Sequence, residues 1–249
     1  MFLYALTVFL GAFLLFQIQP LMGKYVLPWF GGAPAVWSTC LVFFQLVLLA
    51  GYLYAHGLAS RLSQRAARAV HAMLLLASLA VLAALALAWG SPILPGAAWK
   101  PSDPGQPIKK ILVLLAASVG LPYLLLSSTS PLMQAWAARS RPGARVYRLY
   151  ALSNLASLLA LVTYPTLVER LLPLRTQAWL WTGTYLLFTA ASLACARLST
   201  VHPSPALPVP PSPPPSSSIA NHKSQITNLF WFSLAAAGSM MLMAATNQI

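Results

Sequence analysis

Residues 13–32 read FLLFQIQPLMGKYVLPWFGG, and this stretch decides the fold class. It continues an apolar run that starts at the N-terminus and that has the composition of a membrane-crossing helix, yet it carries Gln17, Gln19 and Lys24. Polar and ionisable side chains in such a helix are costly unless they face a bundle interior or a water-filled cavity. We therefore expect this face of the helix to be turned away from lipid.

The composition of the whole chain places it in a bilayer. Of its 249 residues, 59% are hydrophobic and only 7% are charged, whereas soluble domains carry about 25% charged residues. Fifteen Lys and Arg stand against two acids, which gives a formal net charge of +13. These cations fall between apolar runs, where they orient a membrane protein. We predict an integral membrane protein whose partner is the lipid bilayer, and no nucleic-acid partner.

The spacing of the apolar runs gives the number of spans. A bilayer core of about 30 Å needs roughly 20 apolar residues in a helix. Seven runs meet or approach this length, and the last is the shortest: 2–21, 36–56, 70–89, 111–132, 150–168, 177–196 and 229–245. The sequence therefore predicts an all-α, polytopic transmembrane helical bundle of about seven spans.

Composition also divides the chain. Residues 1–196 hold six spans, residues 197–228 form a Pro/Ser-rich linker that cannot build helix or sheet, and residues 229–249 hold the seventh span.

Arginines gather after the second and fourth runs, and that side should be cytoplasmic. The N-terminus then lies inside, and the first run, which lacks a basic leader and a cleavage site, is retained.

Further polar side chains recur at helical spacing on the first, second, fourth and fifth runs. They would either line a cavity or make interhelical hydrogen bonds, each worth typically under about 1 kcal/mol in membranes. A serine and threonine run between Pro122 and Pro131 suits close packing and kinking, or a broken helix at a binding site. The candidate cavity-lining residues are Gln17, Gln19, Lys24, Gln45, Tyr52, Ser128, Asn154 and Ser157.

Charged residues and cysteines suggest no catalysis. Lys24 either extends to the outer membrane interface or pairs with Glu169, which closes the fifth run on the same side. Cys40 and Cys195 lie inside apolar runs and are expected to be small buried hydrophobes. The sequence shows no glycine-rich phosphate loop, no acid pair and no spaced metal ligands. We therefore predict no enzymatic activity, no cofactor and no metal.

Two long strings then carry a resemblance. Residues 13–56 and 121–169 (LPYLLLSSTSPLMQAWAARSRPGARVYRLYALSNLASLLALVTYPTLVE), continued by 229–249, resemble the membrane part of bacterial spermidine synthase-like proteins. That family resembles a major facilitator-like bundle fused to a cytoplasmic polyamine-synthase-like domain. The loop GLASRLSQRAAR (57–68) is similar to the facilitator signature, with Ser60 where the signature prefers Asp.

The resemblance implies a facilitator-type six-helix half plus the start of a second half, in a bacterial inner (plasma) membrane. It also implies a chain that is a membrane fragment, a truncated product or one half of a larger protein, because no synthase-like sequence follows. Its partners would be a second copy, a C-terminal half or a synthase-like domain. The expected function is transport of an unknown small molecule, polyamines included, or else anchoring or sensing for such a domain.

Overall fold

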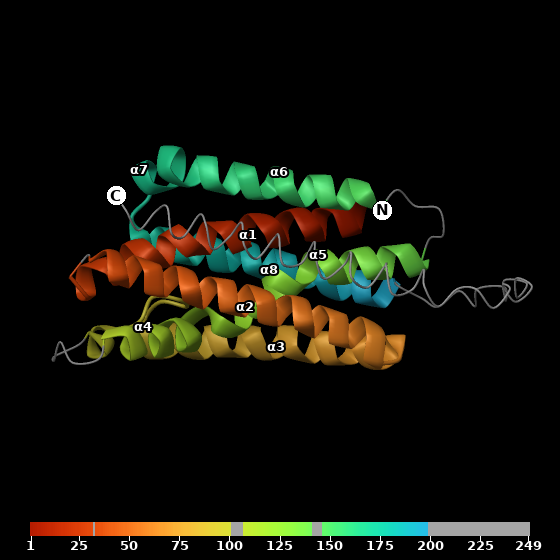
Figure 1. The fold of residues 1–249 in the computed structure, drawn as a ribbon, viewed down its shortest axis with the longest axis horizontal. Coiled ribbons are helices and arrows are strands. Elements are labelled where there is room, and N and C mark those ends of the chain that lie inside the picture. The colour runs from red at the N-terminus through yellow and green to blue at the C-terminus, as the bar shows by residue number, and fades with distance from the viewer. Residues whose placement is uncertain (32, 101–106, 141–145, 199–249) are drawn as a thin grey trace, which may run out of the picture. The chain divides into compact units, whose positions relative to one another are not determined.

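The computed structural model describes residues 1–31, 33–100, 107–140 and 146–198, and these residues belong to one unit, Met1–Val201 (Figure 1). The described residues form helices and connecting turns without a strand. The predicted seventh span, 229–249, and residues 199–228 of the predicted linker lie outside the described residues. The all-helical prediction is therefore confirmed for the described part of the chain.

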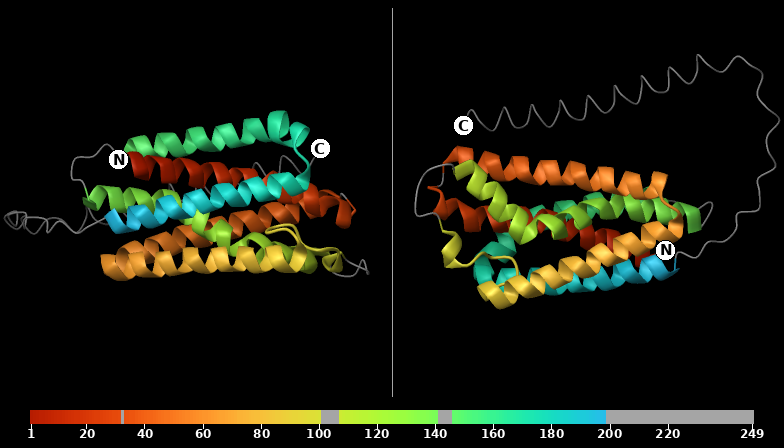
Figure 2. Two further views of the ribbon diagram at one scale, coloured as in Figure 1. Left: turned by 180° about the vertical axis from the view of Figure 1, so that it is seen from behind. Right: turned by 90° about the horizontal axis from the view of Figure 1, so that it is seen from below.

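Six long helical segments run side by side, several of them made of more than one element (Figures 1 and 2). Their elements are α1 (Phe2–Val26), η1 (Leu27–Trp29), α2 (Pro34–Arg61), α3 (Gln64–Trp89), η2 (Ala97–Trp99), α4 (Pro107–Leu115), η3 (Ala116–Gly120), α5 (Leu121–Ser140), α6 (Tyr147–Thr163), η4 (Tyr164–Val168), α7 (Glu169–Leu171) and α8 (Leu174–Leu198).

Five of these segments are long and apolar enough to cross a membrane: Phe2–Trp29, Pro34–Arg61, Gln64–Trp89, Pro107–Ser140 and Tyr147–Leu171. They contain the first five predicted runs and extend beyond them. Helix α8 contains the sixth run and is 25 residues long, but it is not among the five. Hydroxyl and amide side chains such as Gln177, Thr182 and Ser192 lower its hydropathy.

Prolines shape two of the segments without ending them. Proline removes a backbone donor and crowds the preceding turn, so a helix must widen, bend or stop there. The π-helical turn η3 ends two residues before Pro122, and the π-helical turn η4 contains Pro165. Helices α1 and α5 run on through Pro20 and Pro131. The predicted Pro-bracketed serine run therefore lies on a continuous helix.

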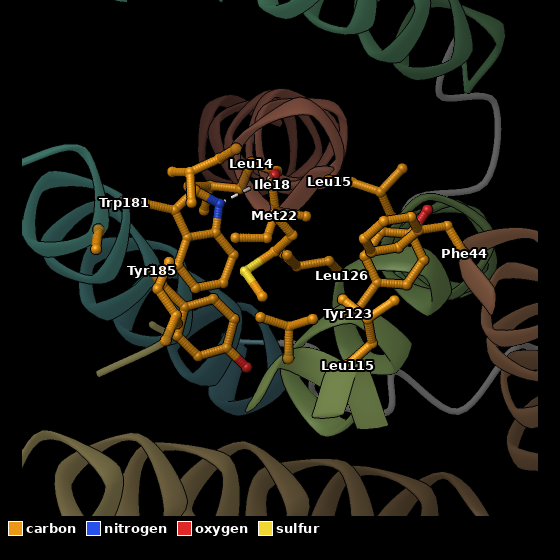
Figure 3. Close-up of a cluster of buried hydrophobic side chains, with 14 of the residues drawn as sticks. Leu14, Leu15, Ile18, Met22, Phe44, Leu115, Tyr123, Leu126, Trp181 and Tyr185 are labelled. Carbon is orange, nitrogen blue, oxygen red and sulfur yellow. Dashed lines mark hydrogen bonds between the residues drawn. The ribbon is translucent and has the colours of Figure 1, made fainter. Parts of the chain in front are cut away.

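Helix α1 is the centre of the unit, in contact with α2, α5, α6 and α8. Figure 3 shows Leu14 beside Trp181 of α8, whereas Leu15 lies on the side of Tyr123 and Phe44. The indole Nε1 of Trp181 donates to the Leu14 carbonyl at 3.0 Å. Helices α6 and α3 lie on opposite sides of the bundle, and α6 belongs to the least buried of the five segments (Figure 1).

The two ends of the bundle carry different cations. At one end, called here the arginine end, α2, α5 and α8 finish and α3 and α6 begin (Figure 1). Its charged residues among those described are Arg61, Arg65, Arg68, Arg139, Arg148 and Arg197. The opposite, lysine end carries Lys24, Lys100, Lys109, Lys110, Glu169, Arg170 and Arg175.

The segment after α3 enters the bundle at the lysine end. Residues 91–95 have no helical structure, yet all five are buried, and Ile93 is fully inaccessible. Irregular backbone at membrane depth is tolerated where protein surrounds it. The Tyr25 hydroxyl donates to the Pro95 carbonyl at 2.6 Å, and an Arg175 guanidinium N–H donates to the Gly90 carbonyl at 3.2 Å. These bonds fix both ends of the buried segment.

Helices α2 and α5 approach most closely at Gly51. A β-carbon at this position would overlap the Ser127 hydroxyl and lie 2.8 Å from the Leu124 carbonyl. Small residues at such contacts let membrane helices pack through their backbones. The absence of a side chain at Gly51 therefore sets the distance between α2 and α5.

We expect Gly51→Ala to destabilise the protein by about 1–3 kcal/mol, because the added methyl forces α2 away from α5. Gly57→Ala on the same helix is the matched control, since nothing lies within 4 Å of the position of its added carbon. Thermal unfolding of both variants in detergent measures the difference. Equal stability of the two variants would contradict close α2–α5 packing.

Candidate functional site

The candidate residues from the opening stretch all lie on α1 but serve different contacts. Gln17 is buried, and its amide nitrogen donates to Thr163 Oγ1 at 3.2 Å and lies 3.4 Å from the Ala160 carbonyl. Both partners belong to α6. Gln17 thus faces a neighbouring helix, as its cost in lipid requires.

Gln19 reaches the other side of α1. Its amide nitrogen donates to the Tyr123 hydroxyl on α5 at 3.0 Å. The Tyr123 side chain is buried, whereas Gln19 is partly exposed. The pair therefore lies at the edge of the packed interior, with one amide group still accessible.

Lys24 and Glu169 form an ion pair at the lysine end, with 3.0 Å between Nζ and Oε1. Each side chain is 40% exposed, so the pair lies at the surface of the unit. It joins the last turn of α1 to α7, directly after the π-helical turn η4. Below it, the Tyr164 hydroxyl donates to Gln177 Oε1 at 3.2 Å and connects η4 to α8.

The two candidate serines bond within their own helices. Ser128 is fully buried, and its hydroxyl donates to the Leu125 carbonyl at 2.8 Å. Ser157 is partly buried and donates to the Ser153 carbonyl at 2.9 Å. Such bonding to the preceding turn satisfies a hydroxyl without an outside partner. Ser128 packs in the interior, away from the exposed surface.

The remaining candidates are exposed on the two helices that flank α1 and α5. Gln45 and Tyr52 lie on one face of α2, seven residues apart, and Asn154 lies on α6 four residues after Tyr150. Tyr52 and Tyr150 are exposed as well, at 50% and 61%. We call the set Gln19, Gln45, Tyr52, Tyr150 and Asn154 the open face.

The open face is polar but uncharged. It offers amide and phenol groups that can donate and accept hydrogen bonds. Among the described residues no group of three or more His, Cys, Asp or Glu side chains could hold a metal ion. The cysteines predicted to be buried, Cys40 and Cys195, are both free and buried. The chemistry available on this face is therefore binding by hydrogen bonds.

A second polar cluster was not predicted from the sequence. His71 of α3 is fully buried, with Nδ1 3.2 Å from the Tyr54 hydroxyl and Nε2 3.4 Å from Ser192 Oγ. The Trp136 ring meets the imidazole edge-on, with centroids 5.8 Å apart. The cluster joins α2, α3, α5 and α8 toward the arginine end. In the sequence His71 is a lone histidine near the start of an apolar run, and no helical spacing of polar residues indicated this cluster.

Comparisons with models of protein families, with curated proteins and with solved structures find no match to this chain. The resemblance to spermidine synthase-like membrane proteins accordingly stays a prediction from the sequence.

A double-mutant cycle tests the ion pair. We expect Lys24→Gln and Glu169→Gln to show a coupling energy of about 0.2–1 kcal/mol, since half-exposed pairs gain little in a solvated environment. The unfolding free energies of the unaltered chain, the two single variants and the double variant, measured in detergent, give this value. Strictly additive effects would show that the two charges do not stabilise each other.

For the buried cluster we expect His71→Ala to cost about 2–4 kcal/mol, because it leaves a cavity and removes the hydrogen-bond partner of the buried Ser192 hydroxyl and the partly buried Tyr54 hydroxyl. The milder Tyr54→Phe should cost about 1 kcal/mol, the usual value of one hydrogen bond. Thermal unfolding in detergent gives both numbers. A His71→Ala variant as stable as Tyr54→Phe would mean that the cluster does not join the helices.

Proposed function

We propose that this chain is a transporter-like membrane bundle whose open face lines a pathway for a small molecule. In this proposal α8 is a sixth span, and the six segments are one facilitator-type half. The chain would be the membrane portion of a spermidine synthase-like protein in a bacterial inner membrane. The other wall of the pathway would come from a second copy, or from further helices of a longer protein.

The open face is the observation that carries this proposal. Gln45, Tyr52 and Asn154 are exposed on helices that are long and apolar enough to cross a membrane. Lipid penalises such groups, so a polar face at this depth meets protein or water. A water-filled pathway satisfies them and explains why exposed amide and phenol groups are found on these two apolar helices.

The charges of the unit indicate which kind of molecule the proposed pathway fits. A polyamine would need carboxylates to balance its positive charge, and the open face carries none. The described acid, Glu169, is engaged by Lys24. An uncharged, hydrogen-bonding molecule therefore fits this half better than a polyamine does.

A membrane anchor or sensor for a cytoplasmic synthase-like domain is the second candidate. It is favoured by the polar groups that are already satisfied inside the unit: Gln17 of α1 donates to Thr163 of α6, and Ser128 donates to a carbonyl of its own helix. Under this interpretation the open face is covered by protein and holds no water.

Cysteine labelling separates the two functions. With Cys40 and Cys195 replaced by alanine, we expect Gln45→Cys and Asn154→Cys to react with a membrane-impermeant maleimide, because the reactive thiolate forms only in water. Gln17→Cys should stay protected, since the position is buried against α6.

Leu155→Cys is the matched control for Asn154→Cys. Leu155 is 50% exposed, and it lies about 100° further around α6 among exposed leucines such as Leu158 and Leu159. Labelling at the open face together with protection at 155 supports a pathway. Uniform protection of the open face in native membranes would contradict it and favour the anchor.

A further inference from the structure

The chain cannot neutralise its own positive charge. Fifteen Lys and Arg stand against two acids, which gives the sequence a formal net charge of +13. Glu169 pairs with Lys24 at the lysine end. The charged residues that the structure describes at the arginine end are all arginines. No carboxylate side chain of the described residues lies at this end, so an anion from the surroundings would be attracted to it.

Two interhelical contacts gather these arginines into a cluster. Arg68 Nη1 donates to the Ala196 carbonyl at 3.2 Å, which places the first turns of α3 beside Arg197 at the end of α8. Arg139 Nη2 donates to the Ala59 carbonyl at 2.8 Å, which places the end of α5 beside Arg61 at the end of α2.

A short α2–α3 connection completes the cluster, because only two residues separate the helices and Arg65 lies in the first turn of α3. All of these side chains are exposed except Arg68, which is partly buried. The arginine cluster comes from the ends of α2, α5 and α8 and the start of α3, which lie at the same end of the bundle (Figure 2). Its members are Arg61, Arg65, Arg68, Arg139 and Arg197.

We propose that the arginine cluster binds the headgroup phosphate of anionic phospholipids in the leaflet that meets this end of the bundle. Guanidinium groups bind phosphate through paired, charge-assisted hydrogen bonds, which a lysine ammonium cannot reproduce. Basic groups near a membrane surface attract anionic lipid by about 1 kcal/mol per residue, and pockets between helix ends bind phosphate headgroups. The inference does not depend on transport.

The unfolding temperature of the full chain in detergent, with added lipid, tests the proposal. We expect phosphatidylglycerol to raise it by roughly 5 °C at saturation, and phosphatidylcholine with the same acyl chains to raise it much less. The test variant is Arg61→Gln/Arg65→Gln/Arg197→Gln. It keeps Arg68 and Arg139 and therefore both interhelical contacts. We expect it to lose more than half of the shift.

The control variant Lys100→Gln/Lys109→Gln/Arg170→Gln removes the same charge from the lysine end and should keep the full shift. An equal shift in all three chains would overturn the proposal, as would an equal response to the two lipids. A shift produced by inorganic phosphate alone would also overturn it, since the headgroup would then not be needed.

If the arginine variant does not fold, a second measurement on the unaltered chain tests the proposal. Native mass spectrometry of the unaltered chain, equilibrated with equal amounts of the two lipids, should show retained phosphatidylglycerol in excess. The excess should fall at high salt, because screening weakens contacts between exposed charges. No preference between the lipids would contradict the proposal.

Discussion

The absence of water around a membrane helix is the constraint on which this structure depends. Carbonyl groups at helix ends have no partner within their own helix and must find one elsewhere. Here arginines from other helices supply three of these partners: Arg139 at Ala59 of α2, Arg175 at Gly90 directly after α3, and Arg68 at Ala196 of α8. Each of these bonds satisfies a carbonyl and also ties two helices together at the level where charge can meet the membrane surface.

The same constraint divides the polar side chains into two groups. Hydroxyls on α5 donate to carbonyls one turn earlier, and Gln17 donates across to α6, so neither needs an outside partner. Gln45 and Asn154 are exposed instead. The first group holds the bundle together, and the second group is the part of the unit that requires something beyond it, either water or another protein surface.

Sequence spacing found residues of both groups but did not distinguish them. Gln17 and Asn154 are amides in apolar runs, and both suggested a face turned away from lipid. Gln17 lies on the central helix, where α6 covers it, whereas Asn154 lies on the peripheral helix α6 and points past the contact with α1. The His71 cluster escaped prediction because its members come from separate helices, and each residue alone looks like an ordinary interfacial side chain.

The sequence by itself determined the all-helical class, the positions of the long apolar helices in the described residues, and the polar positions on α1, because apolar length and helical period are local properties. The tertiary structure decided which helix meets which. It paired Lys24 with Glu169, brought the backbones of α2 and α5 together at Gly51, buried residues 91–95 and gathered the arginines. These contacts join residues far apart in the chain. They depend on the order in which the other helices pack around α1, which the period of a single helix cannot specify.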